Sequence, residues 1–133
     1  MISTIEILQW LIHYAKKKKK KNITLDLNEK NNNGDYPFLK LCGNDECFNI
    51  LVEYAKENNV TLKINDKNNY GKYPLLEGSR NHKLVKLLMN YVNENNILLE
   101  INDKDKYRNS PLINTFYYND FVFLLFHFYH DFY

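Results

Sequence analysis

The chain has 133 residues, of which 44% are hydrophobic and 26% are charged, a balance typical of a folded domain and unlike that of a disordered chain. The net charge of +2 does not by itself indicate nucleic-acid binding, and the six lysines at positions 16–21 leave the rest of the chain net acidic. No apolar stretch reaches the roughly 18 residues of a membrane span. We therefore expect a cytoplasmic protein, with nuclear import through Lys16–Lys21 as an alternative.

An internal repeat of 37 residues organises the chain. Pro37, Pro74 and Pro111 are 37 residues apart, and the segments around them align without gaps. These segments are LDLNEKNNNGDYPFL (25–39), LKINDKNNYGKYPLL (62–76) and LEINDKDKYRNSPLI (99–113). Three copies in register predict a single repeat array over 1–133. Its units are an N-terminal half repeat with a lysine-rich connector (1–24) and three repeats (25–61, 62–98 and 99–133).

The first predicted helix belongs to the half repeat. The segment 7–14 matches 84–91, and Ser3 with Glu6 forms a capping box before it. The connector after it is three residues longer than the next connector, and the lysine run fills this insertion. We interpret the run as a solvated connector. The alternatives are a nuclear import signal and salt-sensitive contact with nucleic acid or an anionic membrane surface, although nucleic acid is disfavoured because no aromatic residues interleave the lysines.

Each full repeat predicts a turn, a short helix and a longer helix. In the middle repeat the polar segment 65–71 ends in Gly71, which suits a strained turn position. Pro74 fits the first turn of a short helix that ends near Ser79. The apolar stripe of a longer amphipathic helix follows at Leu84, Val85, Leu87, Leu88, Tyr91 and Val92. One helix pair cannot bury such a stripe alone, so we expect neighbouring pairs to stack in an all-α fold.

The last predicted helix, Phe121 to Tyr129, has apolar residues nearly all round. Of the 18 residues from 116 to 133, 10 are aromatic. Because the end of an array needs a polar outer face to stay soluble, we expect further repeats after it, or docking on another protein or on a second copy.

The middle repeat resembles a known family. Gly71-Lys-Tyr-Pro-Leu-Leu76, followed by a Val-Lys-Leu-Leu helix, is similar to the ankyrin repeat, whose pattern is Gly-x-Thr-Pro-Leu-His before its first helix. The resemblance extends from about Ser3 to Tyr133 and implies an ankyrin-like solenoid of stacked helix pairs joined by turn or hairpin segments. The family's Thr and His are replaced in all three copies, so we expect most of the side-chain hydrogen bonds that tie its turns together to be absent. Arg108 replaces the turn glycine in the last copy.

The resemblance also implies a function. Ankyrin-like arrays are non-catalytic scaffolds that bind a protein partner on a concave face, made of turn tips and the outward side of the short helices. The candidate partner-binding residues on that face are Asn69, Tyr70, Lys72, Arg80, Lys106, Tyr107, Tyr117 and Tyr118, with Asn32, Asn33, Asp35, Lys40, Glu77 and Asn109 at related positions. We expect Tyr70, Tyr107 and Arg80 to be anchors, because exposed Tyr and Arg often are. The alternative is that the tyrosines pack against adjacent turns.

Other chemistry is not indicated. In the repeat register Cys42 and Cys47 align with Ser79 and Leu84, so we interpret both as core residues. His127 and His130 have no third metal ligand near them. Phosphate loops, nucleophile elbows and paired acids are also missing, so we expect no enzyme activity, cofactor, metal or small-molecule substrate. We attribute the 21 asparagines to composition bias. A regulatory arm of a larger protein remains an alternative function.

Overall fold

The computed structural model describes residues 2–18, 21 and 23–117 and contains six α-helices and no β-strand in this part of the chain. The helices are α1 (Thr4–Lys17), α2 (Pro37–Leu41), α3 (Asp45–Glu57), α4 (Pro74–Gly78), α5 (His82–Glu94) and α6 (Pro111–Tyr117). The all-α prediction is confirmed for these residues. The helix predicted over 121–129 lies outside them.

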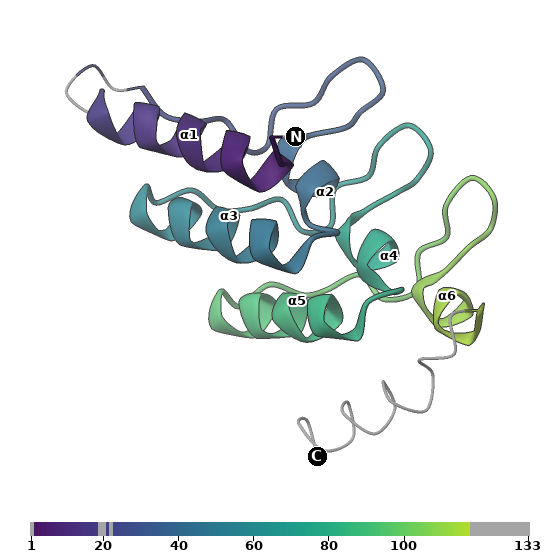
Figure 1. Cartoon of the computed structure of the whole chain (residues 1–133). Helices are drawn as coiled ribbons and strands as arrows, with labels where there is room; N and C mark the ends of the chain where they lie inside the picture. The colour runs from purple at the N-terminus through teal and green to yellow at the C-terminus, as the bar shows by residue number, and fades with distance from the viewer. Residues whose placement is uncertain (1, 19–20, 22, 118–133) are drawn as a thin grey trace.

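The helices lie in two rows (Figure 1). The long helices α1, α3 and α5 lie one beside the next, the short helices α2, α4 and α6 form a second row, and the loops before the short helices all project on the same side. In the first row α3 contacts both α1 and α5, and in the second row α4 contacts both α2 and α6. Each of α2 and α4 also packs on the long helix that follows it. The fold is therefore built from helix pairs that contact their neighbours in chain order.

Proline sets the start of each short helix. Pro37, Pro74 and Pro111 are the first residues of α2, α4 and α6. A proline at this position costs no hydrogen bond, because the N–H groups of the first helical turn have no partner within the helix. The 37-residue spacing of the prolines is therefore the spacing of the short helices, as predicted.

Polar side chains close both ends of the long helices. The Oγ of Ser3 accepts the N–H of Glu6 at 3.2 Å, which is one of the two bonds of the predicted capping box, and the Oδ1 atoms of Asn44 and Asn81 cap α3 and α5. After the last turns, Asn59 and Asn96 have φ of 56° and 54°. Asn tolerates this left-handed conformation better than most residues, so it ends a helix here as glycine often does.

The predicted apolar stripes form the core. Leu51 of α3 and Leu88 of α5 have no exposed surface, and both cysteines are buried free thiols. Burial, with a smaller effect of the Glu77 charge, raises the pKa of the Cys42 thiol to about 12, so the reactive thiolate is strongly disfavoured. The interpretation of Cys42 and Cys47 as core residues is confirmed.

The turns are held by side-chain hydrogen bonds, contrary to expectation. The three equivalent turns span 31–35, 68–72 and 105–109. The Oδ1 of Asn68 accepts the N–H groups of Tyr70 and Lys72 at 3.0 and 2.9 Å. Asn31 and Asp105 form the same pair of bonds in their own turns. An Asn or Asp at the first turn position thus fixes each turn, so Asn31 and Asn68 have a structural role that composition alone did not indicate.

The fourth residue of each turn has a positive φ, which is 77° at Gly34 and Gly71 and 66° at Arg108. A Cβ on Gly34 would lie 2.9 Å from the backbone nitrogen of Asn69, and one on Gly71 would lie 2.9 Å from the Cα of Asp105. In both cases the obstacle belongs to the next turn of the stack. No turn follows 105–109 in the described part of the chain, so a side chain fits at Arg108 and the turn keeps its shape.

Two kinds of side chain join each repeat to the next. The hydroxyl oxygen of Tyr36 lies 2.8 and 2.9 Å from the carbonyl oxygens of Lys63 and Asp66, which share its one proton, and the hydroxyl of Tyr73 donates to the carbonyl of Asp103 at 2.9 Å. These tyrosines stand directly before Pro37 and Pro74 and are long enough to reach the following repeat.

The second kind is an asparagine amide between neighbouring connectors. Asn65 donates to the carbonyl of Leu98 at 2.8 Å and accepts the N–H of Glu100 at 2.9 Å. Asn28 forms the equivalent pair of bonds one repeat earlier. Each amide thereby satisfies one donor and one acceptor of the next connector, where no β-sheet pairs them.

The lysine run only partly follows the prediction. Lys16 and Lys17 are the last residues of α1 rather than part of the connector. The Nζ of Lys16 lies 2.8 Å from the Oε2 of Glu57, and the Nζ of Lys18 lies 5.9 Å from the centre of the Tyr14 ring. Positions 19 and 20 are outside the described residues. The run therefore begins in helix α1 rather than in the connector, while Lys16 and Lys17 are solvent-exposed, as predicted.

Candidate functional site

A groove of about 440 Å³ opens where the turns meet the short helices. We call it the tyrosine groove, and it is lined by Asp35, Leu39, Lys40, Asn68, Tyr70, Lys72, Glu77 and Tyr107. Three of these residues, Tyr70, Lys72 and Tyr107, are among the predicted partner-binding residues. Three more, Asp35, Lys40 and Glu77, were expected on the same face. The structure thus brings together six of the residues that were expected on one face.

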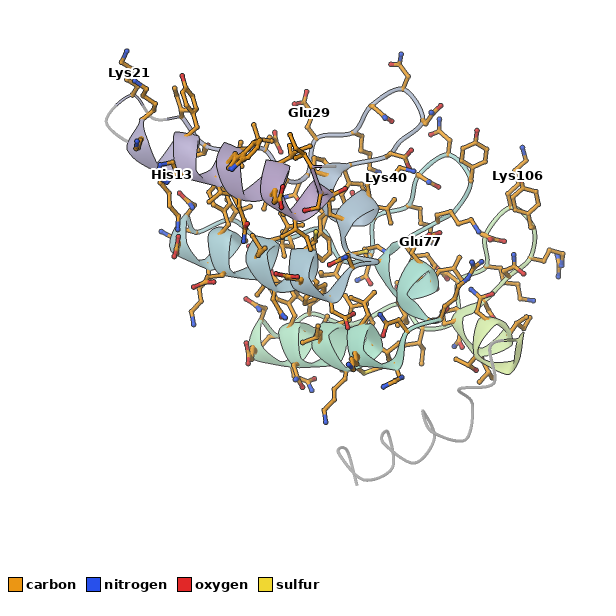
Figure 2. All side chains as sticks on the ribbon, viewed as in Figure 1. His13, Lys21, Glu29, Lys40, Glu77 and Lys106 are labelled. Atoms are coloured by element: carbon orange, nitrogen blue, oxygen red, sulfur yellow. The ribbon has the colours of Figure 1, made fainter. Side chains whose placement is uncertain are left out.

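Two kinds of element position these side chains. The short helices α2 and α4 carry Lys40 and Glu77, and Figure 2 shows both beside the projecting loops. The three turns carry the remaining polar and aromatic residues. Because the short helices and the turns each recur every 37 residues, the groove contains the same repeat position more than once.

The two tyrosines are exposed and face lysines. Tyr70 is 42% exposed and Tyr107 is 66% exposed. The Nζ of Lys106 lies 5.9 Å from the centre of the Tyr70 ring, and the Nζ of Lys72 lies 5.8 Å from that of Tyr107. Each ring therefore contacts a cation of a neighbouring turn yet keeps much of its surface free for a ligand.

One end of the groove holds a satisfied ion pair. The Nζ of Lys40 lies 3.2 Å from the Oδ2 of Asp35, and the amide of Asn68 donates to the Oδ1 of Asp35 at 2.8 Å. The Asn68 hydrogen bond and, after it, Lys40 hold the pKa of Asp35 below its ordinary value of 3.8, against the opposing effect of burial. Asp35 is therefore an ionised residue with its hydrogen bonds already made.

The middle of the groove holds a second ion pair. Lys72 donates to the Oδ2 of Asp105 at 2.5 Å, and the side chain of Asp105 has no exposed surface. Burial alone would raise the pKa of Asp105, but the bonds from Lys72 and Asn109 outweigh it and lower the pKa below 3.8. The positive charge of Lys72 is thus neutralised by Asp105 of the next turn.

Of the described residues that line the groove, Glu77 is the one charged residue that belongs to neither of these ion pairs. No hydrogen bond or ion pair joins it to another side chain in the described part of the chain, whereas Lys40 and Lys72 are both paired. Among the residues that line the groove, the charge without a partner is therefore negative, while the cation of Lys106 lies over the Tyr70 ring beside it. A cation is the group that this arrangement can accept.

Several predicted residues have other roles. The backbone N–H of Asn69 donates to the carbonyl of Asn33, and its amide donates to that of Asn32, both at 2.9 Å. The N–H of Lys106 donates to the carbonyl of Tyr70 at 2.8 Å. Asn69 and Lys106 thus tie adjacent turn tips together and do not line the groove.

Arg80 is exposed beyond the end of α4 and does not line the groove, so its expected role as an interface anchor stays a prediction. The side chain of Tyr117 and the whole of Tyr118 lie outside the described part. The predictions for these two residues stay untested.

Sequence reasoning missed two lining residues. Leu39 was assigned only as the replacement for a family His, and Asn68 was attributed to composition. A signal was present for Asn68, because Asn31, Asn68 and Asp105 stand at the same repeat position. A small polar residue recurring at one register position points to a turn bond even in an asparagine-rich chain.

A larger cavity, of about 750 Å³, lies at the far end of α1 and α3. It is lined by Ala15, Lys16, Ile23, Thr24, Tyr54, Glu57 and Asn58. The charged side chains there, Lys16 and Glu57, pair with each other, and the Tyr54 hydroxyl accepts the N–H of Leu25 at 2.8 Å. Its polar groups are thus occupied by contacts that hold the connector on the helices, so the tyrosine groove is the better candidate site.

Within residues 2–18, 21 and 23–117, no group of three or more His, Cys, Asp or Glu side chains is placed to hold a metal ion. No helix of that same part is long and apolar enough to cross a membrane. A comparison with models of known protein families gives no match, and neither does a comparison with curated proteins.

Proposed function

We propose that the chain is an ankyrin-like repeat solenoid that acts as a non-catalytic scaffold and binds a protein partner in the tyrosine groove. The observation that carries this proposal is the repetition within the groove. Asp35 and Lys72, Lys40 and Glu77, and Tyr70 and Tyr107 are three pairs of residues that are 37 positions apart. The groove therefore runs across consecutive repeats, as a site for an extended segment of another protein does.

The rigidity of the turns supports binding. The side chains of Asn68 and Asp105 fix their own turns, and backbone bonds between turn tips fix each turn to the next. A surface that is ordered before the partner arrives loses little conformational entropy on association. Exposed tyrosines on such a support have the properties of interface anchors.

The charges of the groove indicate the chemistry of the partner. Because Lys40 and Lys72 are paired within the protein, Glu77 is the charge available to a ligand. An Arg or Lys side chain of the partner could pair with Glu77 while its aliphatic part contacts the ring of Tyr70 or Tyr107. The proposed partner therefore presents a basic residue in an extended segment.

Capture from a lysate of the source cells, followed by titration of the purified partner, tests this function. We expect one protein to be captured at both low and high salt, and the double variant Tyr70→Ala/Tyr107→Ala to weaken its binding about 30-fold or more. Glu77→Gln should weaken it by a smaller factor. Leu98→Ala is the matched control, because Leu98 is 86% exposed and lies outside the groove. Equal binding by the double variant and the control would refute the groove as the site.

The rival function is attachment to nucleic acid or an anionic surface through Lys16–Lys21. Two observations count against it, because Lys16 pairs with Glu57 and Lys18 lies over Tyr14. Capture of nucleic acid at low salt only, indifferent to the tyrosine variant, would favour this rival, since phosphate contacts weaken steeply with salt. Capture of a single enzyme subunit would favour a regulatory arm.

A further inference from the structure

Helix α1 carries an apolar stripe that faces solvent. Ile7, Trp10, Leu11 and Tyr14 are 48%, 59%, 51% and 57% exposed. Their i, i+3, i+4, i+7 spacing places them on one face of the helix. A contiguous group of four large apolar side chains, one of them Trp, is unusual on the surface of a protein and marks an interaction site.

This stripe is not the face by which α1 joins the fold. That role belongs to Leu8, Ile12 and Ala15, which are buried, while α1 contacts α3. Helix α1 therefore has two apolar faces, of which the fold uses one.

The repeat register allows the exposed stripe of α1 to be compared with the equivalent positions of α3. In α3 the positions equivalent to Ile7, Leu11 and Tyr14 are Cys47, Leu51 and Tyr54, and these are only 1%, 0% and 3% exposed. There they belong to the buried core, on a helix that contacts α1, α2 and α5. The stripe on α1 thus has the chemistry of a helix–helix interface whose second helix is not in the described chain.

We propose that the second helix is α1 of another copy, packed antiparallel against the first in a two-fold symmetric dimer. Charge selects this arrangement. Glu6 and Lys17 are both exposed and lie three helical turns apart, beside opposite ends of the stripe. In an antiparallel pair, Glu6 of each copy lies beside Lys17 of the other, and the helix dipoles oppose. A parallel pair would bring like charges together.

The dimer would change how the scaffold works. The stripe shares no residue with the tyrosine groove, so each dimer would carry two grooves. A partner with two basic segments would then gain affinity from the second contact without any new chemistry. The proposed dimer does not depend on the proposed function, because its test measures mass alone.

The experiment is sedimentation of the full chain over a wide concentration range. We expect a reversible monomer–dimer equilibrium, and we expect Trp10→Glu to raise the dissociation constant about 30-fold or more, with an unchanged thermal melt at a concentration at which both chains are monomeric. Gln9→Glu is the matched control, because it adds the same charge at an exposed neighbouring position off the stripe and should leave the dimer unchanged.

A charge swap tests the orientation. Glu6→Lys and Lys17→Glu should each weaken the dimer several-fold, and the double variant should restore it, since each copy then offers the reversed pair. A chain that stays monomeric at every concentration would overturn the proposal. So would a dimer that is indifferent to Trp10→Glu, which would place the contact elsewhere, or a monomer whose Trp10 is needed for binding vesicles of anionic lipid.

Discussion

The Nζ of Lys72 lies 2.5 Å from the Oδ2 of Asp105, across the gap between two successive turns. The side chain of Asp105 is wholly buried, whereas that of Lys72 is 24% exposed at the groove. One residue thus belongs to the surface that we propose for binding, and the other to the structure that supports it. The same carboxylate also accepts the N–H groups of Tyr107 and Asn109, so the position of an exposed tyrosine depends on a buried charge.

Two substitutions of Asp105 separate its ion pair with Lys72 from its hydrogen bonds to the turn. Asp105→Ala should lower the free energy of unfolding by about 1–3 kcal/mol, because it leaves backbone N–H groups of the turn without an acceptor. Asp105→Asn should cost less, because Asn31 and Asn68 hold the equivalent turns with an amide oxygen alone. Urea unfolding of both variants gives the comparison. Equal losses would mean that the ion pair with Lys72, rather than the turn, carries the stability.

Acid should destabilise the fold. Asp35 and Asp105 both have pKa values below their ordinary value of 3.8 in the folded chain. A lowered pKa contributes stability that is fully present above the unfolded value and is lost as the pH falls through the folded one. Thermal melts from neutral pH downward should therefore show a falling Tm below about pH 4. Asp105→Asn should flatten this fall, and a parallel fall in wild type and variant would contradict the assignment.

Sequence reasoning predicted the helices and six of the eight residues that line the groove, for physical reasons that differ between residues. The spacing of Pro37, Pro74 and Pro111 was enough to place α2, α4 and α6, because proline suits the first turn of a helix. Tyr70 and Tyr107 were correctly expected on one face, because both belong to turn tips in equal register. Arg80 does not line the groove, because it follows the last turn of α4, where helical periodicity no longer predicts a direction.

The hydrogen bonds between repeats were beyond such reasoning. Tyr36 and Tyr73 could be read as replacements for the family's Thr, but not as residues whose hydroxyls reach the next repeat. Asn65 likewise bonds to residues more than 30 positions away. A bond of this kind depends on how closely successive repeats approach, which local patterns do not encode.

Turn glycine is expected to matter only where another turn stacks on it. Gly71→Ala should destabilise the protein by about 1–3 kcal/mol, because the new Cβ would lie 2.9 Å from the Cα of Asp105 and φ is 77°. Arg108→Gly should be neutral or stabilising by up to about 1 kcal/mol, since it relieves a positive φ of 66°. Chemical denaturation of the two variants measures both. A stabilising Gly71→Ala would show that the turns do not pack as closely as described.

The buried apolar stripe of α5 can be tested by replacing a buried and an exposed leucine with aspartate. Leu88→Asp should unfold the chain, because Leu88 has no exposed surface and an unpaired charge there has no solvation. Leu98→Asp should leave the melt within about 0.5 kcal/mol of wild type, because Leu98 is exposed. Circular dichroism reports both outcomes. A folded Leu88→Asp variant would remove the stripe from the core.

The Tyr73 hydroxyl should make the fold sensitive to alkali. Burial, and after it the charges of Asp103 and Glu100, raises the pKa of Tyr73 from 10.0 to about 12. A raised pKa contributes stability that is fully present below the unfolded value and is lost as the pH rises through the folded one. At neutral pH, Tyr73→Phe should lose about 1 kcal/mol with the bond to the carbonyl of Asp103. Between pH 10 and 12 the wild type should lose this advantage, so the two unfolding curves should converge. A constant difference up to pH 12 would mean that the hydroxyl does not ionise on unfolding in this range and that the bond to Asp103 is unaffected by pH.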